Sequence, residues 1–128
     1  MKILLDTHTA LWLVNDYEKL SKNANEILAT KSNKLYVSHV SIWEIAIKNS
    51  IGKLPELDGG VKAFMSRLGR MPIKLLKIKL EHIEAVEKLD LIHRDPFDRL
   101  LITTALTEGM TILTADGNIH KYDINTIW

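Results

Sequence analysis

Four acidic side chains in this 128-residue chain could together bind divalent cations. They are Asp6, Glu44, Asp98 and Asp116. Asp6 and Asp116 each follow an apolar run, whereas Glu44 and Asp98 stand near expected helix starts. Carboxylates that gather repel one another unless they take up protons or a cation neutralises them. Oxygen ligands of this kind suit Mg²⁺ or Mn²⁺.

Hydrolysis of a phosphodiester is the chemistry that such a group of carboxylates favours. Two divalent ions about 3.5–4 Å apart can activate a water molecule and stabilise the leaving oxygen of a nucleic acid backbone. Two of the acids also have simpler interpretations, which stay open at this point. Asp98 in a first helical turn would complement the helix dipole. Glu44 lies three residues after Ser41, the spacing of a capping box.

Other catalytic chemistries find little support. The chain has no cysteine, which excludes disulfides and thiolate zinc sites. Its histidines lack the H-E-x-x-H spacing, and we expect His8 and His93 to lie beside the site or on the surface rather than to bind metal. Ser38 and Ser41 lack a G-x-S-x-G context, and no glycine-rich phosphate loop is present.

A helix that begins at Asp95 must position Asp98. Asp95 is a good N-cap, Pro96 suits the first turn, and the helix should continue to Gly109. Its apolar positions are too dense for a surface helix and suit packing against a sheet.

The remaining chain alternates short strands with helices. We expect strands over 2–5, 35–38, 74–78, 110–113 and 124–128. We expect helices over 9–14, from Ser21, from Ser41, over 61–68 and over 80–89. Thr7 is a possible cap of the first of these helices, and Ile83, Val86 and Leu89 would form the apolar face of the last. This alternation predicts an α/β fold with a parallel sheet between helices. Ligands of such sheets bind beyond the carboxyl ends of the strands, where the acids should converge.

Composition is that of a soluble globular protein, with 46% hydrophobic and 26% charged residues. We expect one domain over 1–128. The chain starts directly with a strand-like segment, and no apolar run approaches the ~20 residues of a membrane span, so we expect a cytoplasmic protein. Residues 61–80 contain Lys62, Arg67, Arg70, Lys74, Lys77, Lys79 and no acid. This basic stretch is either a solvated helix face or a surface that holds a polyanion.

Several motifs, in this order, resemble the PIN domain, most closely the VapC-type toxins of toxin–antitoxin modules. They are Leu4-Leu5-Asp6-Thr7-His8, residues 40–48, His93-Arg94-Asp95-Pro96-Phe97-Asp98-Arg99-Leu100-Leu101, and Leu113-Thr114-Ala115-Asp116. The resemblance spans nearly the whole chain and implies the PIN-like three-layer α/β/α fold.

The resemblance implies an endoribonuclease that depends on Mg²⁺ or Mn²⁺, with Asp6, Glu44, Asp98 and Asp116 as catalytic and metal-binding residues. The Asp116 position varies more within the family, and Asp95 is similar to the helix cap that supports Asp98. Thr7 and Thr114 would hydrogen-bond the carboxylates or a metal-bound water. Such toxins form homodimers and are silenced by a cognate antitoxin.

Two alternatives come from other functional classes. The first is a PIN fold that has lost catalysis and serves as a binding module, although all four acids are present. The second is a receiver-like signalling domain that binds Mg²⁺. A receiver would need an adjacent acid pair early in the chain and a lysine after a late strand, and neither is found.

Overall fold

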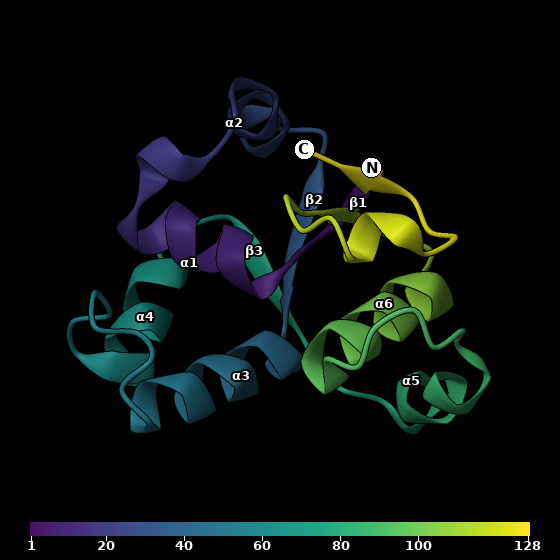
Figure 1. Ribbon diagram of the computed structural model, residues 1–128. Coiled ribbons are helices and arrows are strands. Elements are labelled where there is room, and N and C mark those ends of the chain that lie inside the picture. Colours follow the sequence, from purple (N-terminus) through teal and green to yellow (C-terminus); the bar gives the residue numbers. More distant parts are fainter.

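The computed structural model, which describes residues 1–128, is built on a five-stranded sheet with the order β3-β2-β1-β4-β5 (Figure 1). All neighbouring strands are parallel. The strands are β1 (Lys2–Leu5), β2 (Lys34–Ser38), β3 (Ile73–Leu76), β4 (Thr111–Leu113) and β5 (Thr126–Ile127). The predicted parallel α/β fold is therefore confirmed.

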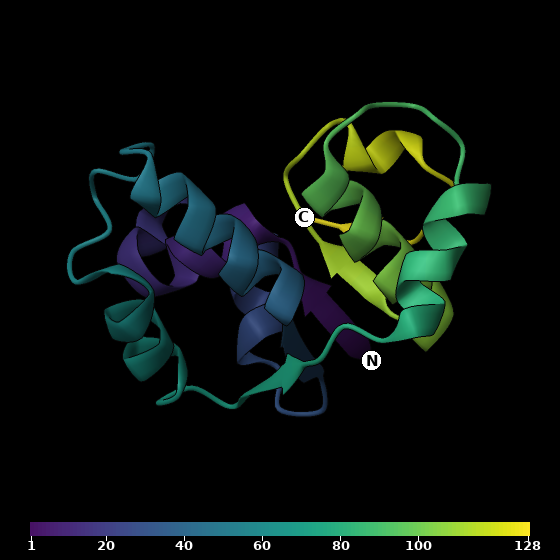
Figure 2. The ribbon, with the colours of Figure 1, turned by 90° about the horizontal axis from the view of Figure 1, so that it is seen from below.

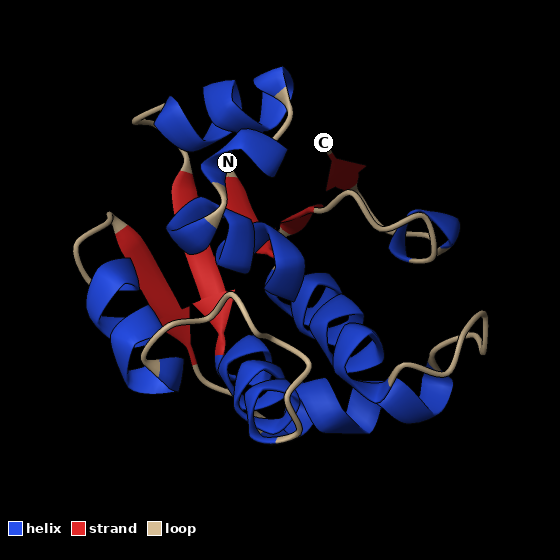
Figure 3. Ribbon diagram, turned by 60° about the vertical axis from the view of Figure 1, so that its left-hand side comes forward, coloured by secondary structure: helices blue, strands red, loops and turns tan.

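Helices cover both faces of this sheet, so the fold has three layers (Figures 2 and 3). The α-helices are α1 (Thr7–Asn15), α2 (Lys22–Ala29), α3 (His39–Ser50), α4 (Gly60–Leu68), α5 (Leu80–Glu84) and α6 (Pro96–Glu108). Three short 3₁₀ helices are η1 (Tyr17–Lys19), η2 (Ala85–Lys88) and η3 (Ile119–Lys121). None of the helices has the length and apolar character needed to span a membrane.

The central strand β1 divides the core into two parts. Ile3 and Leu5 belong to a cluster shared with α1, α2 and α4, whereas Leu4 belongs to a second cluster with α6. All three side chains are fully buried. Because successive side chains of a strand point to opposite faces, one short apolar run anchors both helical layers and fixes the residue that follows, Asp6.

Two helix starts differ from the sequence prediction. Asp6, not Thr7, caps α1, because its carboxylate accepts the N–H of Thr9. Ser38, not Ser41, caps α3 and accepts the N–H of Val40. The capping box proposed for Glu44 is therefore absent, and Glu44 lies in the second turn of α3 with its carboxylate free for other contacts.

The predicted helix over 80–89 is shorter than expected, because α5 passes into η2 after Glu84. Its apolar face is also different: Ile83 is 50% exposed, while His82 is fully buried. The periodicity of Ile83, Val86 and Leu89 was misleading because a 3₁₀ segment does not keep the α-helical spacing. The expected strand over 124–128 shrinks to β5, and η3 was not foreseen.

The start of α6 agrees with the prediction. The Asp95 carboxylate accepts the N–H groups of Phe97 and Asp98, and Pro96 occupies the first turn. The helix ends before Gly109, whose φ of 66° lies in the left-handed region that favours glycine. Asp98 is thereby fixed in the first turn of a helix packed on the sheet.

Candidate active site

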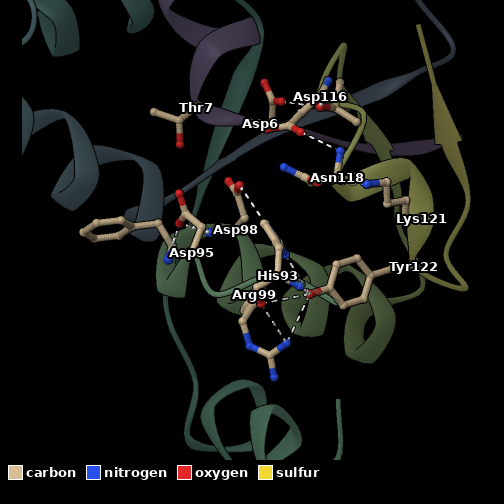
Figure 4. Close-up of polar contacts among 12 residues, drawn as sticks. Asp6, Thr7, His93, Asp95, Asp98, Arg99, Asp116, Asn118, Lys121 and Tyr122 are labelled. Carbon is tan, nitrogen blue, oxygen red and sulfur yellow. Dashed lines mark hydrogen bonds and ion pairs between the residues drawn. The ribbon is translucent and has the colours of Figure 1, made fainter. Parts of the chain in front are cut away.

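Asp6 is a deeply buried acid at the carboxyl end of the central strand (Figure 4). Its side chain is 3% exposed. One carboxylate oxygen accepts the N–H of Thr9 at 2.7 Å, and the other accepts the hydroxyl of Thr114. Burial raises the pKa of the Asp6 carboxyl, and these hydrogen bonds oppose the shift. Both oxygens are thus already engaged within the protein.

Glu44 reaches the same edge from α3 and is 1% exposed. Its Oε1 accepts the hydroxyl of Thr7 at 2.6 Å, and its Oε2 lies 2.5 Å from the ammonium of Lys48. Burial lowers the pKa of Lys48, but the hydrogen bond and charge of Glu44 outweigh it, so the pKa is raised. Lys48 is therefore a charged partner that neutralises a buried carboxylate.

Asp98 completes the acidic group from the first turn of α6. Burial, followed by the charge of Asp95, raises its pKa to about 7, and the charges of Glu44 and Asp116 add to the shift. A hydrogen bond from His93 works in the opposite direction. Repulsion among these carboxylates shows that they share one electrostatic environment, although they come from distant parts of the sequence.

Asp116 lies beyond the end of β4 and is connected to Asp6 through Thr114. The N–H of Asp116 donates to the Thr114 hydroxyl at 3.0 Å, and that hydroxyl donates to Asp6. The Asp116 carboxylate accepts the N–H of Asn118 at 2.7 Å. Asp6 and Asp116 also line the same cavity of about 240 Å³. The contacts expected for Thr7 and Thr114 are thus present.

The donor set suits a hard divalent cation. Oδ1 of Asp98 and one oxygen of Asp116 accept no hydrogen bond within the protein, which leaves them free to bind an ion or its waters. Mg²⁺ needs only a few carboxylates because it retains several waters. However, no three ligand atoms of the quartet lie within 4.8 Å of one another. The structure gathers the four acids at one edge without closing them into a complete coordination shell.

A tighter cluster of possible ligands lies elsewhere, where Glu81, His82 and Glu108 approach within 4.8 Å. His82 Nδ1 accepts the N–H of Lys79, and Nε2 lies 2.8 Å from Glu108. The Lys79 ammonium, 2.9 Å from Glu108, lowers the pKa of that carboxyl. Both ring nitrogens and the carboxylate charge are already paired, so this cluster clamps α5 to α6 rather than offering a metal site.

Three residues behind Asp98 form a directed hydrogen-bond network (Figure 4). The Tyr122 oxygen accepts the backbone N–H of His93 at 3.2 Å and a guanidinium N–H of Arg99 at 3.1 Å. Its own proton is then free for His93 Nδ1, 2.7 Å away. In the neutral tautomer that satisfies these contacts, the His93 proton sits on Nε2, which donates to Asp98 Oδ2 at 3.2 Å. Arg99 and Tyr122 fix the tautomer of the imidazole that orients Asp98.

Sequence reasoning missed three of these supporting residues. Arg99 and Tyr122 carry no local signal, because their contacts join segments far apart in the chain. Lys48 could have been found, since it lies four residues after Glu44, where helical side chains meet. His93 was expected either beside the site or on the surface, and the structure places it beside the site, in contact with Asp98.

Comparison with known proteins gives the family. The PIN domain profile matches residues 3–125, so the chain belongs to the PIN domain family. A search of curated protein sequences gave no match.

Solved structures with the same fold include toxin–antitoxin complexes. The Rickettsia felis VapBC2 structure, bound to a promoter DNA fragment, aligns with a TM-score of 0.74 at 17% identity, covering 99% of this chain and 98% of that one. DNA-bound VapBC from Salmonella typhimurium aligns with a TM-score of 0.67 at 16% identity, covering 99% of this chain and 97% of that one. FitAcB from Neisseria gonorrhoeae aligns with a TM-score of 0.65 at 16% identity, covering 98% of this chain and 96% of that one. At these identities the likeness establishes the fold.

The pairing of Lys48 with Glu44 leads to a first prediction, on metal affinity. A cation that uses Glu44 must compete with the Lys48 ammonium, so the Lys48→Met protein should bind Mn²⁺ about tenfold more tightly than the wild type. Isothermal titration calorimetry measures this difference. Lys22→Met, which removes an exposed lysine from α2, is the control and should leave affinity unchanged. Weaker Mn²⁺ binding by Lys48→Met would show that the lysine supports the ion rather than competing with it.

Proposed function

We propose that this protein is a divalent-metal-dependent endoribonuclease that acts as the toxin of a toxin–antitoxin pair. One observation carries the proposal: four carboxylates from β1, α3, α6 and the segment after β4 meet at one edge of a PIN fold. The pKa of Asp98, raised to about 7 by burial and by its acidic neighbours, reflects this gathering of negative charge. A site that must concentrate negative charge in this way is suited to bind Mg²⁺ or Mn²⁺.

Asp6, Glu44, Asp98 and Asp116 would hold the metal in this proposal. A bound divalent cation supplies positive charge that activates water and stabilises the leaving oxygen of a phosphodiester. Thr7 and Thr114 hold Glu44 and Asp6 in fixed orientations through their hydroxyls. His93 holds Asp98 from the side opposite its free oxygen. The chain thus supplies a rigid acidic rim, which is its main contribution to the reaction.

The basic stretch supports an RNA substrate only in part. Lys79 is paired with Glu108, and Arg67 donates to Asn15 at 2.7 Å. The remaining four basic residues form no ion pair within the chain and are exposed; they are Lys62, Arg70, Lys74 and Lys77. Free cations of this kind attract a polyanion and make its binding salt-dependent.

An antitoxin and a second copy of the chain are the proposed protein partners. Exposed apolar side chains support such contacts, since Trp43 is 53% exposed and Ile51 59% exposed at α3, while Leu80 and Leu91 near α5 are more exposed still. The Trp43 ring meets Phe97 edge to face, with centroids 4.9 Å apart, close to Asp98 in the sequence of α6. A toxin of this kind would act on RNA in the cytoplasm.

Cleavage of a mixed RNA pool tests the proposal. We expect the purified chain to cut RNA in Mg²⁺ or Mn²⁺ and not in EDTA, because the carboxylates alone cannot stabilise a leaving oxygen. A DNA pool of matched sequence, analysed in parallel, measures the preference for RNA. Cutting that persists in EDTA would contradict the metal-dependent mechanism. A folded, metal-binding protein that cuts no RNA would favour the catalytically silent binding module.

A further inference from the structure

Two aromatic side chains of α1 stand directly beside the acidic group. Trp12 follows His8 by one helical turn, and their ring centroids are 6.0 Å apart. Both rings line the cavity of about 240 Å³ whose other walls are Asp6, Ala115 and Asp116. The lining of this cavity therefore combines two aromatic rings with two of the four site acids.

The Trp12 ring is held in place before any ligand arrives. It is partly buried and packs against the core cluster of α1, and the Trp128 ring meets it edge to face with centroids 5.7 Å apart. His8, by contrast, is exposed. The cavity thus has one rigid aromatic wall, and a fixed ring loses little conformational freedom when a planar group stacks on it.

A second hollow, of about 470 Å³, is also lined by His8 and Trp12. Its charged lining residues are two acids and two lysines: Asp16, Lys19, Lys53 and Glu56. Lys19 is paired with Asp16 at 2.8 Å. This surface therefore has no net positive charge to attract a phosphate, whereas an uncharged aromatic ring could stack against Trp12.

We propose that this cavity is a nucleobase subsite, in which Trp12 stacks on the base of a nucleotide adjacent to the cleaved phosphodiester. The inference rests on the ribonuclease function proposed above and assigns a position to the substrate within it. Because Asp6 and Asp116 belong to the same cavity, a base stacked on Trp12 brings its own or its neighbour's phosphate to the acidic edge. Stacking on tryptophan accepts any base, so this subsite positions the strand more than it reads sequence.

Binding of single-stranded RNA to variants of Trp12 tests the subsite. The measurement is fluorescence anisotropy of a 5′-labelled oligonucleotide that contains the cleavage site mapped for the wild type, with Mg²⁺ present and Asp98→Asn in every protein to prevent cutting. Adding Trp12→Leu should weaken RNA binding about tenfold. Trp12→Phe, which keeps an aromatic face, should instead keep most of the affinity of the protein with Trp12 intact. Tyr17→Leu, the same kind of change at an exposed ring outside both hollows, should leave affinity unchanged.

Oligonucleotides with a single abasic nucleotide identify the stacked position. One abasic site next to the cleaved bond should weaken binding to the Asp98→Asn protein, the parent of the other variants, about tenfold. The same abasic site should have little further effect on binding to the protein that also carries Trp12→Leu, because both changes remove the same contact. Unchanged binding by a folded Trp12→Leu protein, or additive losses at every abasic position, would overturn the subsite. A parent that binds no RNA, together with a wild type that cuts none, would overturn the ribonuclease proposal itself.

Discussion

The Asp98→Asn protein is expected to lose at least about a hundredfold in RNA cleavage while becoming more stable than the wild type in the absence of metal. The amide keeps the shape of the side chain and can still accept the hydrogen bond of His93. It cannot supply the negative oxygen that a divalent cation needs. Loss of activity together with a gain in stability is the expected mark of a residue that the fold holds at an energetic cost.

The gain in stability follows from the raised pKa of Asp98. Its carboxyl has an ordinary pKa of 3.8 and a folded value of about 7, so the folded chain binds this proton more tightly than the unfolded chain. The free energy of unfolding therefore falls as pH rises through this window, and the full cost is present above pH 7. After allowance for solvent screening, Asp98→Asn should relieve about 1–2 kcal/mol at pH 8 and very little near pH 4.

Thermal unfolding in EDTA at pH 5 and pH 8 measures this effect. The melting temperature of Asp98→Asn should exceed that of the wild type by about 5 °C at pH 8, and the difference should shrink at pH 5. Asp58→Asn, at an exposed acid in the loop before α4, is the matched control and should leave the melting temperature unchanged at both pH 5 and pH 8. A less stable Asp98→Asn protein at pH 8 would mean that Asp98 carries little unfavourable charge in the folded state.

The sequence predicts those parts of the site that depend on neighbouring residues. Asp95 and Pro96 mark the start of α6 through local capping, and Asp6 is placed by the apolar strand immediately before it. The alternation of strands with helices also predicted a parallel sheet, whose geometry brings the ends of β1 and β4 together. These features could be found because their causes lie within a few residues of each other.

Other parts of the site depend on contacts that no local pattern reveals. The spacing of Ser41 and Glu44 matched a capping box, but the N-cap of α3 is Ser38. Glu44 is therefore not a capping residue, and its carboxylate accepts the hydroxyl of Thr7 from α1. Because α3 packs against α1, Glu44 contacts Thr7 with one carboxylate oxygen while the other contacts Lys48 of its own helix. Tertiary packing thus decided between two interpretations that the sequence left open.

Arg99 is the second position at which we expect a large effect, here on stability. It is only 9% exposed and has no carboxylate partner. Instead, its guanidinium donates to the carbonyl of Asp90 at 2.8 Å, the carbonyl of Leu89 at 3.1 Å and the hydroxyl of Tyr122 at 3.1 Å. These bonds attach the segment before α6, which includes His93, to the helix that carries Asp98.

The free energy of unfolding of the Arg99→Met protein should be about 3 kcal/mol lower than that of the wild type, because the partly buried carbonyls of Leu89 and Asp90 and the buried Tyr122 hydroxyl lose their donor. Urea unfolding measures this loss. Arg99→Lys should recover little of it, since one ammonium cannot span acceptors that the planar guanidinium reaches together. Asp90→Ala, which keeps its backbone carbonyl, is the control and should cost under about 0.5 kcal/mol. An Arg99→Met protein as stable as the wild type would mean that water satisfies these carbonyls equally well.

Tyr122→Phe separates the role of this network in catalysis from its role in stability. It removes the hydroxyl that fixes the His93 tautomer but keeps the ring, so we expect a stability loss of only about 1 kcal/mol. Cleavage should nevertheless fall about tenfold at saturating metal, because His93 can then protonate either nitrogen and no longer always donates to Asp98. Undiminished cleavage by Tyr122→Phe would confine the network to holding the fold together. A selective loss would show that Asp98 depends on a hydrogen-bond chain that begins at a buried arginine one residue away.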